Sequence, residues 1–410
     1  MGWTTRETEA LLREAFPWGA HVTVAGGAEF VSIVYEVVEC GVDPDGATVR
    51  FERDPGDTLQ FVTRAELECA ATTGLLELST GARIRQPQVD DISTLASPLR
   101  DLIGYQSPSD SPWVARMRLH QSWWRTFRLR VPFGYGPTPK SKKRYGNMLA
   151  ASAADAGRNF LTPEARNAYD ERLARTKVGV DAWRTTRNLL ASQPLAFNVF
   201  GHLSKHLELA TGLFRCLLGE QEVAKVTSIE IERLSDALGD RTAFDAFATY
   251  TRPDGHTACI AVETKLTEPF SQQAYDWNHY RRHSAFATDV WATSHVDLLG
   301  DPRWSQLWRN HLLARAETSR DPELGPATVL IAYHPSDPHC ADNIAGYQAL
   351  LTRPTCVKGV DLLAIRNALD GLVADDEYQT KWVHDFSARY VDLQLSDALV
   401  GLEDLAPAEQ

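Results

Sequence analysis

The pattern of apolar and polar positions is clearest between residues 195 and 335, where helical and strand periods alternate. Residues 199–218 place apolar side chains at 3.6-residue spacing, which predicts a helix that ends at Gly219. Runs of branched apolar residues predict strands, and further periodic segments predict helices. The strands are expected at 225–234, 243–250, 257–266 and 327–333, and the helices at 269–282, at 305–316 and from 359 onward. This order is typical of an α/β fold.

Residues 1–90 predict a small α+β domain of their own. Turn sequences separate runs that are rich in Val, Ile, Phe and Tyr. The expected elements are a helix at 5–16, strands at 22–24, 30–38, 47–51 and 58–63, a helix at 64–73 and a linker at 83–98. Because this unit has no catalytic constellation, we expect it to be accessory. The remainder, 98–410, divides into a mainly helical part at 98–190 and a core at 191–340.

Composition excludes several classes of protein. The chain is 43% hydrophobic, which is enough apolar material for a packed core. No apolar run approaches about 18 residues, and the first residues carry no apolar leader segment, so we expect neither a membrane span nor a secretory signal. Six scattered cysteines without a C-x-x-C pair argue against a structural zinc site. They favour a reducing compartment, and we expect a cytoplasmic protein.

The net charge of −12 is unevenly distributed along the chain. From Ser111 to Ala154 there is no acid, although this window contains nine Lys and Arg residues. A nucleic-acid backbone responds to local potential rather than to the sum over the chain. The candidates for DNA contact are Arg125, Arg128, Arg130, Lys140, Lys142, Lys143 and Arg144. A solvated basic face, with the nearby aromatic side chains buried in the core, is the alternative interpretation.

The candidate chemistry lies in a predicted hairpin. Side chains alternate across a strand, so Glu263 and Lys265 are expected to share the exposed face of the strand at 257–266. Thr264 is expected to point the other way, toward the core. The preceding strand carries Asp245, which lies beside Glu263 if the register allows. The hairpin would then present two carboxylates and one ammonium on a single face.

Two neighbouring carboxylates repel each other, and oxygen ligands suit Mg²⁺. A bound cation polarises a phosphate, and a nearby lysine orients the attacking water or neutralises developing charge. An acid-x-Lys triplet alone is weak evidence, and the informative part is its place at the end of an apolar strand after a hairpin turn. A surface hairpin with a cross-strand ion pair is the structural alternative.

At these residues the sequence resembles the PD-(D/E)XK nuclease superfamily, which has the restriction-endonuclease-like fold. The matching residues are Asp245 and, after seventeen intervening residues, Glu263-Thr264-Lys265, and the helix at 199–218 is similar to the first core helix of the superfamily. Phe244 stands where the superfamily often has Pro. Further segments resemble an uncharacterised bacterial family of restriction-endonuclease-like proteins; they lie at 146–149, 159–161, 192–200 and 306–310.

This resemblance covers roughly residues 100–400 and implies a mixed sheet flanked by helices, with the small α+β domain at the N-terminus. It implies that Asp245 and Glu263 hold Mg²⁺, for which Mn²⁺ can substitute, and that Lys265 assists the attacking water. The superfamily often adds a Glu from an earlier element; of Glu230 and Glu232, the preferred ligand is Glu230. Glu268 is a further candidate for the metal shell or a phosphate.

The function implied is a Mg²⁺-dependent endonuclease that hydrolyses DNA, in restriction or phage defence. RNA is not excluded as the substrate, and a homodimer or a defence-system partner protein is compatible with this role. One alternative is a catalytically inactive nucleic-acid-binding or scaffold protein on the same fold. A carboxylate-pair hydrolase that acts on sugars is another, but it leaves Lys265 unexplained.

Two histidine pairs have i,i+4 spacing, His202 with His206 and His279 with His283. Such pairs can bind a transition metal. There is no H-E-x-x-H motif and no obvious third ligand, so they are interpreted as histidines on polar helix faces. No Walker-type loop or G-x-S-x-G elbow is present, which disfavours an ATPase and a serine hydrolase.

Overall fold

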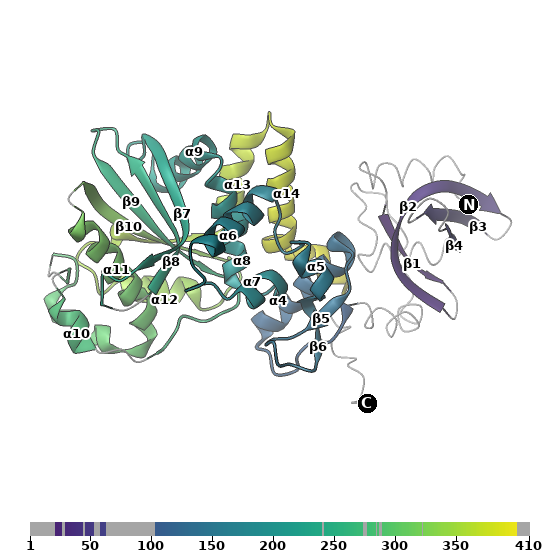
Figure 1. Ribbon diagram of the computed structural model, residues 1–410, viewed down its shortest axis with the longest axis horizontal. Helices are drawn as coiled ribbons and strands as arrows, with labels where there is room; N and C mark the ends of the chain where they lie inside the picture. The colour runs from purple at the N-terminus through teal and green to yellow at the C-terminus, as the bar shows by residue number, and fades with distance from the viewer. Residues whose placement is uncertain are drawn as a thin grey trace. The chain divides into compact units, whose positions relative to one another are not determined.

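The structure is a computed structural model, shown in Figure 1. It describes residues 21–26, 29–43, 46–52, 58–62, 103–239, 242–273, 277–283, 285–286, 289–321 and 323–399. The chain divides into two compact units. One consists of residues 1–151 together with 393–410, and the other of residues 152–392. The N-terminal unit expected from the sequence is therefore part of a larger unit that includes the C-terminus.

The expected N-terminal strands are present as an antiparallel sheet in the order β1-β2-β3-β4. Its strands are β1 (His21–Gly26), β2 (Glu29–Asp43), β3 (Gly46–Glu52) and β4 (Thr58–Val62). The helices expected at 5–16 and 64–73 and the linker expected at 83–98 lie outside the described residues.

The other described elements of this unit are the two strands of a short hairpin and three helical segments. They are α4 (Pro112–Trp123), the π-helix η1 (Trp124–Leu129), β5 (Phe133–Tyr135), β6 (Arg144–Leu149) and the 3-10 helix η7 (Leu393–Leu399). The Ser111 hydroxyl accepts from the Val114 N–H and begins α4. The side chains of Arg116 and His120 on α4 bond to Ser396, which ties the C-terminal segment to this helix.

The second unit is built on a mixed sheet in the order β11-β10-β9-β8-β7. Its strands are β7 (Lys225–Ser235), β8 (Thr242–Thr251), β9 (Thr257–Lys265), β10 (Leu324–Tyr333) and β11 (Val357–Asp361). Strands β7, β8 and β9 form an antiparallel meander, whereas β10 runs parallel to both β9 and β11. Gly255, with φ of +86°, turns the chain between β8 and β9, a conformation that favours glycine.

Helices cover both faces of this sheet, as Figure 1 shows. On one face, α11 (Ser305–Arg320) and α12 (Cys340–Gln348) pack over Phe247, Ala261 and Ile331. On the other face lie α8 (Ser192–Ala196), the π-helix η2 (Phe197–Gly201), α9 (Leu207–Leu218) and α13 (Leu362–Val373). Burial on both faces explains why β9 reads as a nearly continuous apolar run.

The second unit contains further helices. They are α5 (Ala151–Asp155), α6 (Pro163–Arg175), α7 (Ala182–Arg187), α10 (Trp277–Arg282), α14 (Glu377–Tyr390) and the 3-10 turns η3 (Thr293–His295), η4 (Leu298–Gly300), η5 (Pro302–Trp304) and η6 (Pro354–Cys356). The predicted α/β class, with a mixed sheet between helices, is confirmed.

Three predicted elements differ from the structure. The helix expected at 199–218 is broken at residues 204–206, because these residues form tight turns between η2 and α9. The apolar stripe continues across the break through buried Leu203 and Ala210, so periodicity gives no sign of it. Of the helix expected at 269–282, only α10 is present among the described residues. The C-terminal region begins with strand β11, which was not predicted, before α13.

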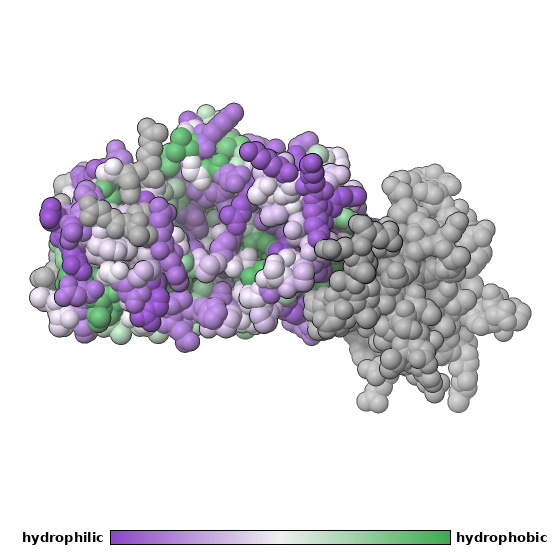
Figure 2. All heavy atoms as spheres, turned by 90° about the horizontal axis from the view of Figure 1, so that it is seen from below, coloured by the Kyte–Doolittle hydropathy of each residue, from purple (hydrophilic) through white to green (hydrophobic). Residues whose placement is uncertain are grey.

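The described surface is mostly hydrophilic. In the view of Figure 2, hydrophilic residues predominate over the coloured part, and hydrophobic residues gather only in small groups. The large hydrophobic side chains that are exposed among the described residues are Tyr135, Val178, Leu298, Leu363, Leu372 and Tyr378. Among the described helices, none has both the length and the apolar composition needed to cross a bilayer.

The expectation that Arg125 contacts DNA does not agree with its position in the structure. Its side chain is buried, and the guanidinium donates to the carbonyl oxygens of Gly146, Val131 and Ile103 at 2.6, 2.7 and 3.1 Å. Burial, with a smaller effect of Arg144, lowers the pKa of Arg125 to about 9. The guanidinium therefore ties η1 to β6 and to the backbone at Val131 and Ile103, and it is not available to a phosphate.

We expect Arg125→Leu to destabilise the protein by about 2–4 kcal/mol, because three backbone carbonyls lose their buried donor. The matched control is Lys142→Leu, since Lys142 is an exposed cation of the same unit. Urea unfolding of both variants measures the difference. Equal stabilities would contradict the structural role of Arg125.

Candidate functional site

The candidate site lies where strands β8 and β9 separate. Their pairing ends at Ala246 opposite Val262, so Asp245 and Glu263 are the next residues in register, and this is the register on which the expected pairing of the two acids depended. Beyond this pair, Oδ2 of Asp245 accepts from the backbone N–H and from the hydroxyl of Thr264, both at 2.7 Å. A side-chain carboxylate thus takes the place of a ladder acceptor, and this fixes the position of Asp245.

Glu263 and Lys265 lie side by side on β9, with Nζ of Lys265 3.0 Å from Oε1 of Glu263. Both side chains were expected on an exposed face, but they are only 8% and 5% exposed. The correction has a simple cause, because α11 covers this face. Gln306 and Asn310 of α11 donate to the two carboxylate oxygens of Glu263 at 2.5 and 2.8 Å.

Lys265 also has a second partner on α11. Its Nζ donates to Oε1 of Gln306 at 2.9 Å, and the same oxygen accepts from the N–H of Ser271 at 2.8 Å. The Gln306 amide therefore bonds to both Glu263 and Lys265. This arrangement fixes the orientation of the carboxylate and of the ammonium before any ligand binds.

The acid that β7 contributes is Glu232, not Glu230. Glu230 is exposed and lies 3.5 Å from Arg233, whereas Glu232 is buried and accepts from Gln193 of α8 at 2.6 Å. Residues two apart on a regular strand share a face. Glu232 has a φ of +51°, which is rare for a residue with a side chain, and it interrupts the β7–β8 pairing. The two glutamates consequently have different surroundings.

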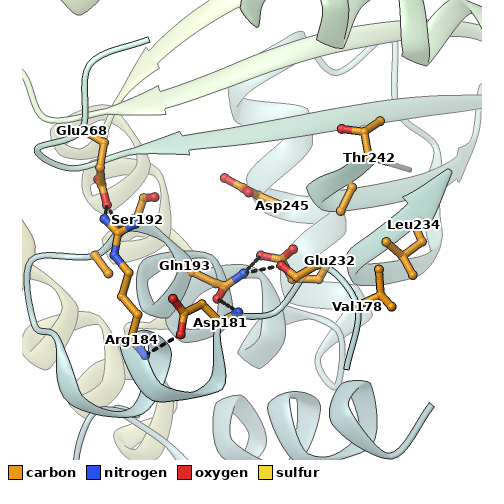
Figure 3. Close-up of a pocket in the computed structure, with 13 residues that line it drawn as sticks. Val178, Asp181, Arg184, Ser192, Gln193, Glu232, Leu234, Thr242, Asp245 and Glu268 are labelled. Carbon is orange, nitrogen blue, oxygen red and sulfur yellow. Dashed lines mark hydrogen bonds and ion pairs between the residues drawn. The ribbon is translucent and has the colours of Figure 1, made fainter. Parts of the chain in front are cut away.

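A pocket of about 430 Å³ adjoins Glu232 and Asp245. Figure 3 shows Asp245 pointing into it between Glu232 and Glu268. Glu268 forms an ion pair with Arg184 of α7 and accepts from the N–H of Ser192 at 3.1 Å. The pocket is thus lined by four carboxylates, those of Asp181, Glu232, Asp245 and Glu268, and by the guanidinium of Arg184.

The electrostatics of the cluster follow from burial and like charge. Burial, together with the charge of Glu263, raises the pKa of Asp245 to about 7. Burial and the nearby Asp245 also raise the pKa of Glu232 well above its ordinary value. Burial acts to lower the pKa of Lys265, but the adjoining Glu263 carboxylate outweighs it and raises that pKa. The site holds negative charge that one ammonium does not fully compensate.

The basic residues predicted to contact DNA differ in how far their side chains are exposed. Lys140, Lys142, Lys143 and Arg144 are exposed on or just before β6, and Arg130 is exposed at the end of η1. Arg128 is half-buried, with its guanidinium 5.7 Å from the centre of the Trp123 ring. Tyr105 lies beneath the ammonium of Lys143, which is 3.3 Å from the centre of the ring. With Arg125 excluded, six of the candidates remain.

The two histidine pairs also differ in their surroundings. His279 and His283 direct ring nitrogens to the carbonyl oxygens of Leu238 and Ala237 at 2.8 and 2.9 Å. His202 is fully buried, which contradicts its interpretation as a polar-face residue. Burial lowers the pKa of His202 to about 4, so its ring is neutral at physiological pH.

Sequence reasoning missed several residues that organise the site. Thr264 was expected to point into the apolar core, but its hydroxyl bonds to Asp245. Gln306 and Asn310 were noted only as part of a segment with family resemblance. Their i,i+4 spacing on a predicted helix was the available signal, because it places two amides on one face. Gln193 had no comparable signal.

The raised pKa of Asp245 leads to a stability prediction for Asp245→Asn, with divalent metals removed by EDTA. Between pH 3.8 and about 7 the folded wild type binds a proton that the unfolded chain has lost, so its stability falls as the pH rises. The variant lacks this proton and can still accept from Thr264. Its advantage in free energy of unfolding should therefore grow up to pH 7 and then level off, at about 1–3 kcal/mol.

Urea unfolding at a series of pH values from 5 to 8 measures this difference. The control is Glu230→Gln, which removes a carboxylate of the neighbouring strand outside the cluster. A stability difference for Asp245→Asn that does not change with pH would contradict the electrostatic description of the site.

Comparison with known proteins gives one match. The family model described as the PD-(D/E)XK nuclease superfamily matches residues 108–392, which is more than half of the chain. No curated protein and no solved structure matches significantly. The matched region includes the mixed sheet, the acids of β8 and β9 and the lysine beside them. The chain belongs to the PD-(D/E)XK nuclease superfamily.

Proposed function

We propose that the protein is a Mg²⁺-dependent endonuclease that hydrolyses DNA phosphodiester bonds, with a role in restriction or another form of antiviral defence in the cytoplasm. The observation that carries this proposal is the placement of Asp245 and Glu263 in register where β8 and β9 separate, with Lys265 beside them. Membership of the nuclease superfamily supports the reaction class. The substrate and the biological role are our inference.

The donor set fits a hard divalent cation. Asp245 and Glu263 offer carboxylate oxygens, which Mg²⁺ and Mn²⁺ prefer, and the raised pKa of Asp245 reflects its burial and then the neighbouring charge of Glu263. When bound, such a cation polarises the scissile phosphate and neutralises charge in the transition state. Among the described acids, Glu232, Asp245 and Glu263 do not all approach within 4.8 Å of one another. We therefore assign Asp245 and Glu263 as the ligands and Glu232 as a nearby acid that adds to the attraction.

Lys265 acts as a cation in this mechanism. Its raised pKa keeps the ammonium protonated, so it can donate to a phosphate oxygen or orient the attacking water, but it cannot serve as a general base. The Gln306 and Asn310 amides hold Glu263 in one orientation from α11. This preorganisation avoids reorganisation of the side chains during the reaction.

DNA affinity is assigned to the exposed cations Lys140, Lys142, Lys143 and Arg144. They lie in a segment without acids, so the local potential is positive although the chain as a whole is negative. The exposed ring of Tyr135 on β5 offers a surface on which a base can stack. Neither type of contact reads sequence, so we assign this surface to affinity for the backbone and not to target choice.

Cleavage of supercoiled plasmid DNA tests the activity. Purified wild type should nick or linearise the plasmid with Mg²⁺ or Mn²⁺ and not with EDTA. Lys265→Met and Asp245→Asn should lower the rate by about 10²-fold or more, because each removes charge that acts on the transition state. Glu230→Gln should cleave at the wild-type rate, since Glu230 lies outside the cluster.

Two outcomes would reject the proposed function. The first is equal background cleavage by the wild type and by both site variants. The second is DNA binding that survives Asp245→Asn in a protein without measurable Mg²⁺ affinity, which would favour an inactive nucleic-acid-binding protein on the same fold. A single-stranded RNA substrate, assayed in parallel, distinguishes a ribonuclease from a deoxyribonuclease.

The basic residues lead to a separate prediction. Replacing Lys140, Lys142 and Lys143 with Ala should weaken binding of duplexes of any sequence. The slope of log affinity against log salt should fall by about 3, because each lost phosphate contact contributes about 0.9. The control replaces Lys225, Lys358 and Lys381 with Ala, which changes the net charge equally. The assignment fails if both triple variants show the same slope.

A further inference from the structure

A second cluster of ligand groups lies among the helices of the second unit, away from the acids of β8 and β9. It consists of Glu164 on α6, His202 just after η2, and His206 at the start of α9. One ligand atom from each residue can be chosen so that all three lie within 4.8 Å of one another. Among the described residues, this is the group of three such side chains that meets this distance.

The spacing of these groups suits an ion better than direct hydrogen bonds. Oε2 of Glu164 lies 3.8 Å from Nδ1 of His202, and Oε1 lies 3.8 Å from Nε2 of His206. Hydrogen bonds of this type are about 2.7–3.2 Å long. Tetrahedral ligands that lie about 2.0–2.1 Å from Zn²⁺ are separated by about 3.4 Å, so a small contraction of this group is sufficient.

The orientation of His202 is set by Gln379 of α14. Oε1 of Gln379 accepts from Nε2 of His202 at 2.7 Å, so this nitrogen carries the proton. The lone pair of Nδ1 then faces Glu164, and the Thr162 hydroxyl donates to it at 3.0 Å. A histidine that ligates a metal commonly donates its second N–H to an oxygen in this way.

His206 occupies a position for which its own helix does not account. It stands at the N-cap of α9, where Ser, Thr, Asp and Asn are preferred, and its side chain makes no capping hydrogen bond. The break at residues 204–206 instead turns the ring toward Glu164 and His202, with the two imidazole centres 4.5 Å apart. His206 and Glu164 are partly exposed, so the site is open to solvent.

We propose that Glu164, His202 and His206 form a transition-metal site that binds Zn²⁺ and joins α6 to the junction between η2 and α9. Two imidazole nitrogens and one carboxylate favour Zn²⁺ over Mg²⁺, whose preferred ligands are oxygens. Three protein ligands leave a fourth position for water. Tyr378 of α14, whose hydroxyl donates to Glu164 at 2.5 Å, lies at the exposed edge. The site is separate from the proposed nuclease centre in both its residues and its metal.

Titration of residues 1–410 with Co²⁺, a spectroscopic probe for Zn²⁺ sites, tests the proposal. The wild type should bind one equivalent with visible absorption of low-symmetry Co²⁺, and Zn²⁺ should displace it. His206→Ala and Glu164→Gln should each lower the affinity by more than about 100-fold, and Gln379→Met by roughly 10–100-fold, because it frees the His202 ring. His283→Ala is the matched control, since that ring bonds to a backbone carbonyl.

A crossed comparison separates this site from the nuclease centre. Asp245→Asn should keep the Co²⁺ and Zn²⁺ binding and lose Mg²⁺ binding, and Glu164→Gln should show the reverse. Zn²⁺ should raise the melting temperature of the wild type and of His283→Ala, but not that of Glu164→Gln. The proposal is overturned if Glu164→Gln, folded by circular dichroism, binds Co²⁺ as tightly as wild type, or if wild type binds none.

Discussion

The site depends on the pair of hydrogen bonds by which Thr264 holds the Asp245 carboxylate where β8 and β9 separate. These bonds compensate part of the cost of burying a charge beside two other acids. They also connect Asp245 to the residue between Glu263 and Lys265, so the two strands cannot shift relative to each other without breaking the contact. The geometry of the site is therefore a consequence of how the sheet ends.

The same region shows how one buried charge is balanced against another. The face of β9 that carries Glu263 and Lys265 is covered by α11, whose Gln306 amide bonds to both of these side chains. Neutral amides satisfy these groups without adding net charge, so the negative potential of the acids persists. The amides thus stabilise the arrangement of the side chains and leave the attraction for a cation intact.

Much of this fold could be predicted from the sequence, because the strands β7–β10 have strong apolar patterns and a recognisable turn at Gly255. Asp245 and Glu263 followed from hairpin register and residue alternation. Glu232 did not, since alternation gives Glu230 and Glu232 the same face and only the positive φ at Glu232 separates them. Arg125 was misjudged because charge alone suggests exposure. Two of the carbonyl oxygens that accept hydrogen bonds from its buried guanidinium come from segments more than 20 residues away in the sequence. The break at 204–206 was hidden by an uninterrupted apolar stripe.

The division of the chain has a consequence for its connectivity. The unit that contains the exposed lysines is assembled from two segments, 1–151 and 393–410, and the Ser396 hydroxyl hydrogen-bonds to Arg116 and His120 of α4. During synthesis this unit remains incomplete until the whole of residues 152–392 and then the segment around Ser396 have left the ribosome. A fragment that stops at residue 392 would retain every residue of the β-sheet site. It would lack Ser396, which hydrogen-bonds to α4 in the unit that contains the lysines.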